Sequence, residues 1–298
     1  MSETKALTPE DVYRLTAAAG PGAENITPPE VRAYYVDQIH AKSREDLVIW
    51  PDVSYGPDAR HSLDMYVPKE RPATSLPVVM FFFGGGFIEG SKNRDGQWIS
   101  GNVAAHFARH QMIGITANYR LAPDFQWPEG SRDVARAVEW VRENISEYGG
   151  DADRIALMGH SSGASHVASY TLRDDLCPPE GQVIKAAILL SGAYSPNPAA
   201  PDPRQTAYYG EDTSKYAEMG SLGNVKSNVP VFILVAENDV FNFQIAATRL
   251  IQEVAVHQHR VPWFRMLHGH NHVTPLFSID TDDPSVGPEL IEFVQRYV

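Results

Sequence analysis

The chain has 298 residues, of which 43% are hydrophobic and 21% are charged, as is ordinary for a soluble globular enzyme. This length can bury one large core, and we expect a single domain over residues 1–298. The formal net charge of −12 at pH 7 argues against nucleic acid or an anionic membrane as a partner.

The first 50 residues are predicted to be mostly helical. Thr8-Pro9 is typical of a helix start with proline at the first helical position, and Gly20-Pro21 is typical of its end. Thr27-Pro28-Pro29-Glu30 has the spacing of a capping box. An apolar stripe with helical period follows it, at Val31, Tyr35 and Ile39. Because these helices precede the first strand, we expect residues 1–50 to form a cap over the core.

From about Val53 the pattern changes to strands that alternate with amphipathic helices. Residues 62–67 alternate polar and apolar side chains, as a half-buried edge strand does. Residues 77–83 are apolar throughout, as expected of a strand covered on both faces. Further strands are predicted at 112–117, 155–158, 184–190, 231–235 and 262–267, with a helix after the last. The alternation predicts an α/β fold with a mostly parallel sheet and helices on both faces.

Four of these strands end in residues suited to catalysis. The strand at 155–158 runs into Gly159-His160-Ser161-Ser162-Gly163, a G-x-S-x-G pattern that places its serine on a strained turn before a helix. Glu237 and Asp239 follow the strand at 231–235, and Gly84-Gly85-Gly86-Phe87 follows residues 77–83. The last strand is followed by three histidines, His268, His270 and His272. Since the carboxyl ends of parallel strands meet at one edge of a sheet, we expect these groups to lie together.

These motifs resemble the α/β-hydrolase superfamily, and more narrowly the carboxylesterases related to hormone-sensitive lipase and to feruloyl esterases, with kynurenine formamidases close by. The resemblance covers residue 54 to the C-terminus. It rests on the glycine loop, the serine turn, Asn-Tyr-Arg-Leu-Ala-Pro at 118–123, Gly-Asp-Ala-Asp-Arg-Ile at 150–155, and the chain order Ser, Asp, His. It implies the α/β-hydrolase fold with about eight strands, an N-terminal helical cap and no cofactor.

The resemblance also implies a role for each residue. Ser161 is expected to be the nucleophile, His272 its general base and Asp239 the carboxylate that orients the imidazole. The backbone N–H groups of Gly85, Gly86 and Ser162 are expected to bind the oxyanion. Glu237 is the alternative acid and His270 the alternative base. Phe83 stands where the family usually has a histidine, so we expect it to shape the glycine loop by packing.

The histidine cluster raises the question of a metal site. His268, His270 and His272 alternate, so in a strand they would share one face and could bind a metal. Gly269 and Asn271 favour a loop instead, and no carboxylate lies within the cluster. We therefore expect no metal site.

Aromatic side chains near the strand ends are candidates for the pocket wall. The residues expected to bind substrate are Phe87, Trp98, Tyr194 and Phe241. The proline-rich loop at 194–203 is expected at the mouth of the site.

The sequence thus predicts a serine hydrolase that cleaves small-molecule carboxylic esters of small to medium acyl groups through an acyl-enzyme intermediate. The alternatives are an arylformamide or amide hydrolase with the same triad, and a non-catalytic ligand-binding protein on the same fold. The chain has a single cysteine, Cys177, and its polar N-terminus lacks the profile of a signal peptide. No apolar run is long enough for a membrane span, so we expect a cytoplasmic location. A homodimer and a monomer both stay open.

Overall fold

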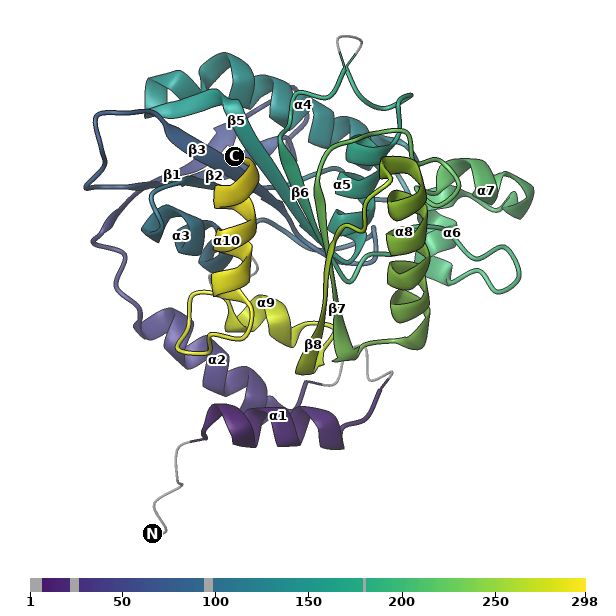
Figure 1. The fold of residues 1–298 in the computed structure, drawn as a ribbon, viewed down its shortest axis with the longest axis horizontal. Helices are drawn as coiled ribbons and strands as arrows, with labels where there is room; N and C mark the ends of the chain where they lie inside the picture. The colour runs from purple at the N-terminus through teal and green to yellow at the C-terminus, as the bar shows by residue number, and fades with distance from the viewer. Residues whose placement is uncertain (1–6, 22–26, 94–98, 179–180) are drawn as a thin grey trace.

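An eight-stranded sheet runs through the middle of the molecule (Figure 1). The structure is a computed structural model, and it describes residues 7–21, 27–93, 99–178 and 181–298. The strands lie in the order β1-β2-β4-β3-β5-β6-β7-β8. Their bounds are β1 (Leu47–Ser54), β2 (Ser62–Pro68), β3 (Leu76–Phe82), β4 (Ile113–Ala117), β5 (Gly150–His160), β6 (Ala186–Leu190), β7 (Val231–Asn238) and β8 (Trp263–Asn271).

The sheet is mostly parallel, as predicted. β2 is antiparallel to both of its neighbours, β1 and β4, whereas every pair from β4 to β8 is parallel. β4 and β6 are buried along their whole length, because helices cover both faces of the parallel part. The apolar runs of the sequence therefore form the centre of the core.

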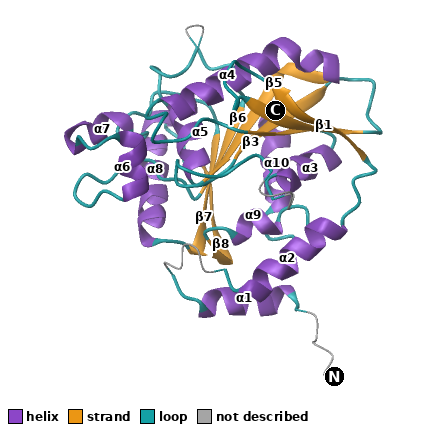
Figure 2. Ribbon diagram, turned by 180° about the vertical axis from the view of Figure 1, so that it is seen from behind, coloured by secondary structure: helices purple, strands orange, loops and turns teal. Residues whose placement is uncertain are grey.

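Helices pack on the two faces of the sheet (Figures 1 and 2). α3 (Gly101–Arg109) and α10 (Gly287–Tyr297) lie together, where His106 donates to the carbonyl of Gly287 over 3.2 Å. α4 (Glu129–Asn144) packs against α5 (Ser162–Leu172), and α8 (Phe241–Gln258) packs against β7. The shorter helices are α6 (Pro203–Tyr209), α7 (Tyr216–Met219) and α9 (Thr274–Ser278), with 3-10 turns at Ile145–Tyr148 and Thr213–Lys215. No described helix is long and apolar enough to cross a bilayer.

The first two helices, α1 (Pro9–Ala18) and α2 (Pro29–Ala41), lie beside β8 and α9 (Figure 1). α1 begins as predicted, with a capping box between Thr8 and Asp11. The capping box predicted for α2 is wrong, because no side chain caps that helix and the Thr27 hydroxyl accepts a hydrogen bond from Asn271 instead. The predicted apolar stripe of α2 is buried.

Two strand predictions need correction at the β1 edge. β2 is not an edge strand, because β1 lies outside it and begins at Leu47, within the segment expected to be helical. β1 escaped prediction because its register shifts between Trp50 and Val53, where Asp52 has φ 54°. The polar Asp64 of β2 is also buried, since it forms an ion pair with Lys92 rather than facing solvent.

Candidate active site

The turn between β5 and α5 holds Ser161 in a strained conformation. Its φ of 54° and ψ of −122° are rare for a residue with a side chain, and its N–H donates to the carbonyl of Leu190 over 2.9 Å. The flanking glycines are sterically required. A Cβ on Gly159 would lie 2.5 Å from the carbonyl oxygen of Gly163, and one on Gly163 would lie 2.2 Å from that of Phe82. The strand–turn–helix geometry predicted for this motif is present.

Three side chains from three strand ends form one hydrogen-bonded chain. Asp239 follows β7, His272 follows β8, and both are buried. The Nδ1 of His272 lies 2.9 Å from Oδ1 of Asp239, and its Nε2 lies 2.9 Å from Oγ of Ser161. With the proton on Nδ1, the ring donates to the carboxylate and accepts from the serine hydroxyl. The structure thus brings the predicted nucleophile, base and carboxylate together.

His272 is held by further contacts. The ring of Phe243 stacks on it with centroids 4.7 Å apart and planes 19° apart. Nε2 of His160 lies 2.8 Å from the backbone carbonyl oxygen of His272 and donates to it. Oδ1 of Asp239 also accepts the N–H of Val240 over 2.9 Å, which fixes the carboxylate. No local pattern singles out Phe243 from its neighbours, because its contact with His272 depends on the turn that starts α8.

The alternative acid, Glu237, and the alternative base, His270, are not part of the hydrogen-bonded catalytic triad. Glu237 is exposed, accepts the N–H of Gly269 over 2.9 Å and faces His268. His270 is buried and bonded to the hydroxyls of Thr274 and Ser285, and burial lowers its pKa to about 4. Neither side chain forms a hydrogen bond with Ser161.

The loop expected at the end of the last strand is not there, because Gly269 and Asn271 both belong to β8. The strand is nevertheless irregular. Gly269 has φ 74°, and the register between β7 and β8 shifts at this point. His268 consequently faces solvent while His270 is buried, so the two do not share one face. Within the described part of the chain no group of three or more His, Cys, Asp or Glu side chains is arranged to hold a metal.

The glycine loop after β3 lies next to the serine. A Cβ on Gly84 would be 2.8 Å from Cβ of Ser161, and one on Gly85 would be 1.9 Å from the carbonyl oxygen of Glu89. Gly86 has φ 59° and lines the same cavity as Ser161 and Ser162. Ser162 opens α5, where the first N–H groups of a helix have no acceptor within it. The backbone donors expected for an oxyanion therefore border the nucleophile.

Packing against Tyr119 supports the glycine loop at Phe83. The ring of Phe83 stacks on Tyr119, with centroids 4.6 Å apart and planes 16° apart. The Tyr119 hydroxyl donates to the carbonyl of Phe83 over 2.8 Å and lies 3.2 Å from Oγ of Ser162. Tyr119 belongs to the Asn-Tyr-Arg-Leu-Ala-Pro motif, so that motif and Phe83 hold the loop together.

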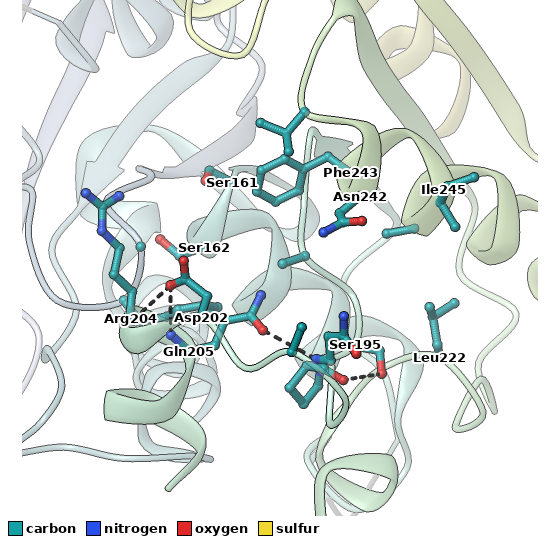
Figure 3. Close-up of a pocket in the computed structure, with 18 of the residues that line it drawn as sticks. Ser161, Ser162, Ser195, Asp202, Arg204, Gln205, Leu222, Asn242, Phe243 and Ile245 are labelled. Atoms are coloured by element: carbon teal, nitrogen blue, oxygen red, sulfur yellow. Dashed lines mark hydrogen bonds between the residues drawn. The ribbon is translucent and has the colours of Figure 1, made fainter. Parts of the chain in front are cut away.

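A cavity of about 580 Å³ opens onto Ser161 (Figure 3). One wall comes from the loop before α6 and from α6 itself, and it carries polar groups, including Ser195, Asn197 and Gln205. The opposite wall comes from the start of α8 and includes Phe243 and Ile245. The proline-rich loop thus lies at the site, as predicted. None of the described residues of α1 and α2 lines this cavity.

The four residues predicted to bind substrate do not all lie at the cavity. Phe87 lines the cavity, and Trp98 lies outside the described residues. Tyr194 is instead a core residue whose hydroxyl donates to the carbonyl of Leu189 over 3.3 Å. Phe241, the first residue of α8, is 69% exposed and does not line this cavity, whereas Phe243 does.

Known proteins resemble this chain in sequence over part of its length. Residues 63–174 match the sequence model of the BD-FAE family. Esterase LipC of Mycobacterium tuberculosis is 34% identical over 124 residues, which are 41% of this chain and 30% of that protein. Bile salt-activated lipase of Mus musculus is 36% identical over a 169-residue alignment that covers 50% of this chain and 26% of that protein. The matched segments therefore span only about a quarter to a third of these relatives.

Solved structures resemble almost the whole chain. Esterase B from Lactobacillus rhamnosis has a TM-score of 0.71 at 17% identity, covering 89% of this chain and 90% of that one. A hyperthermophilic esterase from Pyrobaculum calidifontis has a TM-score of 0.65 at 17% identity, covering 97% of both chains. At this level of identity the likeness establishes the fold.

Proposed function

We propose that this chain, an α/β-hydrolase that resembles carboxylesterases in sequence, is a serine hydrolase of carboxylic esters with small to medium acyl groups. The observation that carries the proposal is the unbroken hydrogen-bonded chain from Asp239 through His272 to Ser161, at the opening of a cavity. The names of the related proteins, which include esterases and a lipase, support the same reaction class.

The geometry suits a two-step reaction. The Ser161 oxygen attacks the ester carbonyl while Nε2 of His272 takes the hydroxyl proton. The Asp239 carboxylate stabilises the imidazolium that forms. The oxyanion accepts from the N–H groups of Gly85, Gly86 and Ser162, and the intermediate collapses as His272 returns the proton to the leaving alcohol. Water then cleaves the acyl-enzyme by the same proton transfers in reverse order.

The cavity fits this substrate class. Its volume of about 580 Å³ lies in the range of small-molecule sites, and it has one polar and one apolar wall. The chemistry uses only side chains and backbone groups of this chain. A cytoplasmic location stays a prediction from the sequence, and the choice between a monomer and a homodimer stays open.

The experiment that tests the proposal compares two substrates. We expect para-nitrophenyl butyrate to be hydrolysed with a higher kcat/KM than N-formylkynurenine, and Ser161→Ala to abolish both reactions. Formamide cleavage far above ester cleavage would replace the esterase by the amide hydrolase with the same triad. Absence of turnover on both substrates would favour the non-catalytic binding protein.

A further inference from the structure

The catalytic cavity carries two positive charges that the described part of the chain leaves without a carboxylate partner. Arg204 of α6 and Arg249 of α8 both line it. The nearest acidic side chains in sequence are engaged elsewhere. Asp202 accepts the backbone N–H groups of Arg204 and Gln205, and Glu253 accepts the N–H of Gly223.

Arg204 is positioned by the oxyanion loop. A Cβ on Gly86 would lie 2.6 Å from Cδ of Arg204 and 3.4 Å from its Nη1, so the side chain packs directly on this glycine. In Figure 3 the guanidinium extends away from the Asp202 carboxylate, which stays at the helix start. Arg204 also borders a smaller hollow, of about 120 Å³, that shares Ser161 and His272 with the main cavity. The guanidinium therefore stands beside the reacting centre.

The charge of the cavity is opposite to that of the protein. The arginine and aspartate side chains that line the main cavity are Arg204, Arg249 and Asp202, whose formal charges sum to +1. A further carboxylate, Glu89, lines the smaller hollow. The whole chain carries −12. A cleft with the opposite sign to its protein selects ligands by charge, and this one favours a monoanion.

Arginine fits a carboxylate especially well. Its planar guanidinium binds both carboxylate oxygens with parallel hydrogen bonds, whereas a lysine offers a single point charge. Arg204 is only partly exposed, so solvent screens the pairing less than at the surface.

From this geometry we propose that Arg204 is a specificity-determining residue that pairs with a carboxylate of the substrate. The inference rests on the proposed esterase function. It narrows the substrate class to esters that carry a free carboxylate on the acyl or the alcohol part. Arg249 adds positive potential from the opposite wall.

The test uses pairs of esters of similar size. One pair carries the charge on the acyl part: the para-nitrophenyl half-ester of adipic acid against para-nitrophenyl hexanoate. The other carries it on the alcohol part: para-acetoxybenzoate against phenyl acetate. For each pair the ratio of kcat/KM, acidic over neutral, is measured in the wild type and in variants. Comparing ratios between variants cancels the intrinsic reactivities of the two esters.

In at least one pair we expect Arg204→Gln to lower this ratio about 10-fold to 100-fold, as loss of a charge-assisted hydrogen bond does. The ratio in Arg204→Lys should lie between the wild-type ratio and that of Arg204→Gln. Arg14→Gln is the matched control, because it removes one positive charge from an exposed position on α1 and should leave the ratio at the wild-type value. Added salt should lower the wild-type ratio.

The inference is overturned if the ratio in Arg204→Gln stays within two-fold of wild type for both pairs while the neutral esters are hydrolysed. In that case the esterase function stands and only the role of Arg204 falls. If the wild type hydrolyses no ester of either pair, the proposed function itself fails and the inference fails with it.

Discussion

Replacing the buried carboxylate by an amide, Asp239→Asn, tests the electrostatic part of the site. The substitution keeps the shape of the side chain, and the amide oxygen can take the place of Oδ1, which accepts from both His272 and Val240. What is lost is the negative charge beside an imidazole that becomes positive only in the transition state. The charge centres are about 4 Å apart, so at an effective dielectric constant of about 20 the lost interaction is about 4 kcal/mol. We therefore expect kcat to fall about 10³-fold.

The assay is saturating hydrolysis of para-nitrophenyl butyrate, with active sites counted by a covalent inhibitor and folding checked by circular dichroism. Glu237→Gln is the matched control, since that carboxylate lies two residues earlier but is exposed and faces His268. We expect it to change kcat less than three-fold. A loss below ten-fold in Asp239→Asn, or a larger loss in Glu237→Gln, would show that Asp239 does not stabilise the imidazolium.

The remaining predictions concern the supports of the site and the buried histidines. Phe243→Ala removes the ring stacked on His272, worth about 1 kcal/mol, and should lower kcat about five-fold, whereas the exposed Phe241→Ala should not. Equal losses in the two variants would show that the Phe243 ring does not support His272. Gly86→Ala should lower kcat/KM at least about ten-fold, while Gly20→Ala, at a similar positive φ but with open space around it, should cost only stability in thermal unfolding. Burial lowers the pKa of His270 to about 4, so the unfolded chain binds the extra proton between about pH 6.5 and 4 and stability falls on acidification. From urea unfolding, His270→Asn should reduce the loss of stability between pH 7 and pH 5 by about 2 kcal/mol, and an unchanged loss would show that this group does not titrate with unfolding.

Apart from β1, the strands and the candidate residues at their ends could be predicted from the sequence, because they depend on local patterns. Apolar runs such as those of β4 and β6 have no other place than the middle of a sheet covered on both faces. Once the strands are parallel, the residues after them meet at one edge. This placement left Glu237 and His270 as alternatives, and the resemblance to the hydrolase family favoured Asp239 and His272. The need for glycine on both sides of Ser161 could also be predicted, because neither position has room for a Cβ.

The features that could not be predicted from the sequence depend on contacts between distant segments or on small rotations of a helix. The burial of Asp64 follows from Lys92, which lies far along the chain and reaches back to it. Whether Phe241 or Phe243 faces the cavity depends on the residue at which α8 begins, and sequence patterns locate helix ends only to within a few residues. The position of Arg204 beside the site depends on the packing of α6 on Gly86, which no local sequence pattern indicates.

The central claim, that Ser161 is an activated nucleophile, is tested most directly by a fluorophosphonate probe and mass spectrometry of the intact chain and its peptides. We expect one adduct per chain, located on Ser161, lost in Ser161→Ala and formed much more slowly in His272→Ala. A chain that stays unmodified while its fold is intact, or an adduct on another residue such as the adjacent Ser162, would contradict the account.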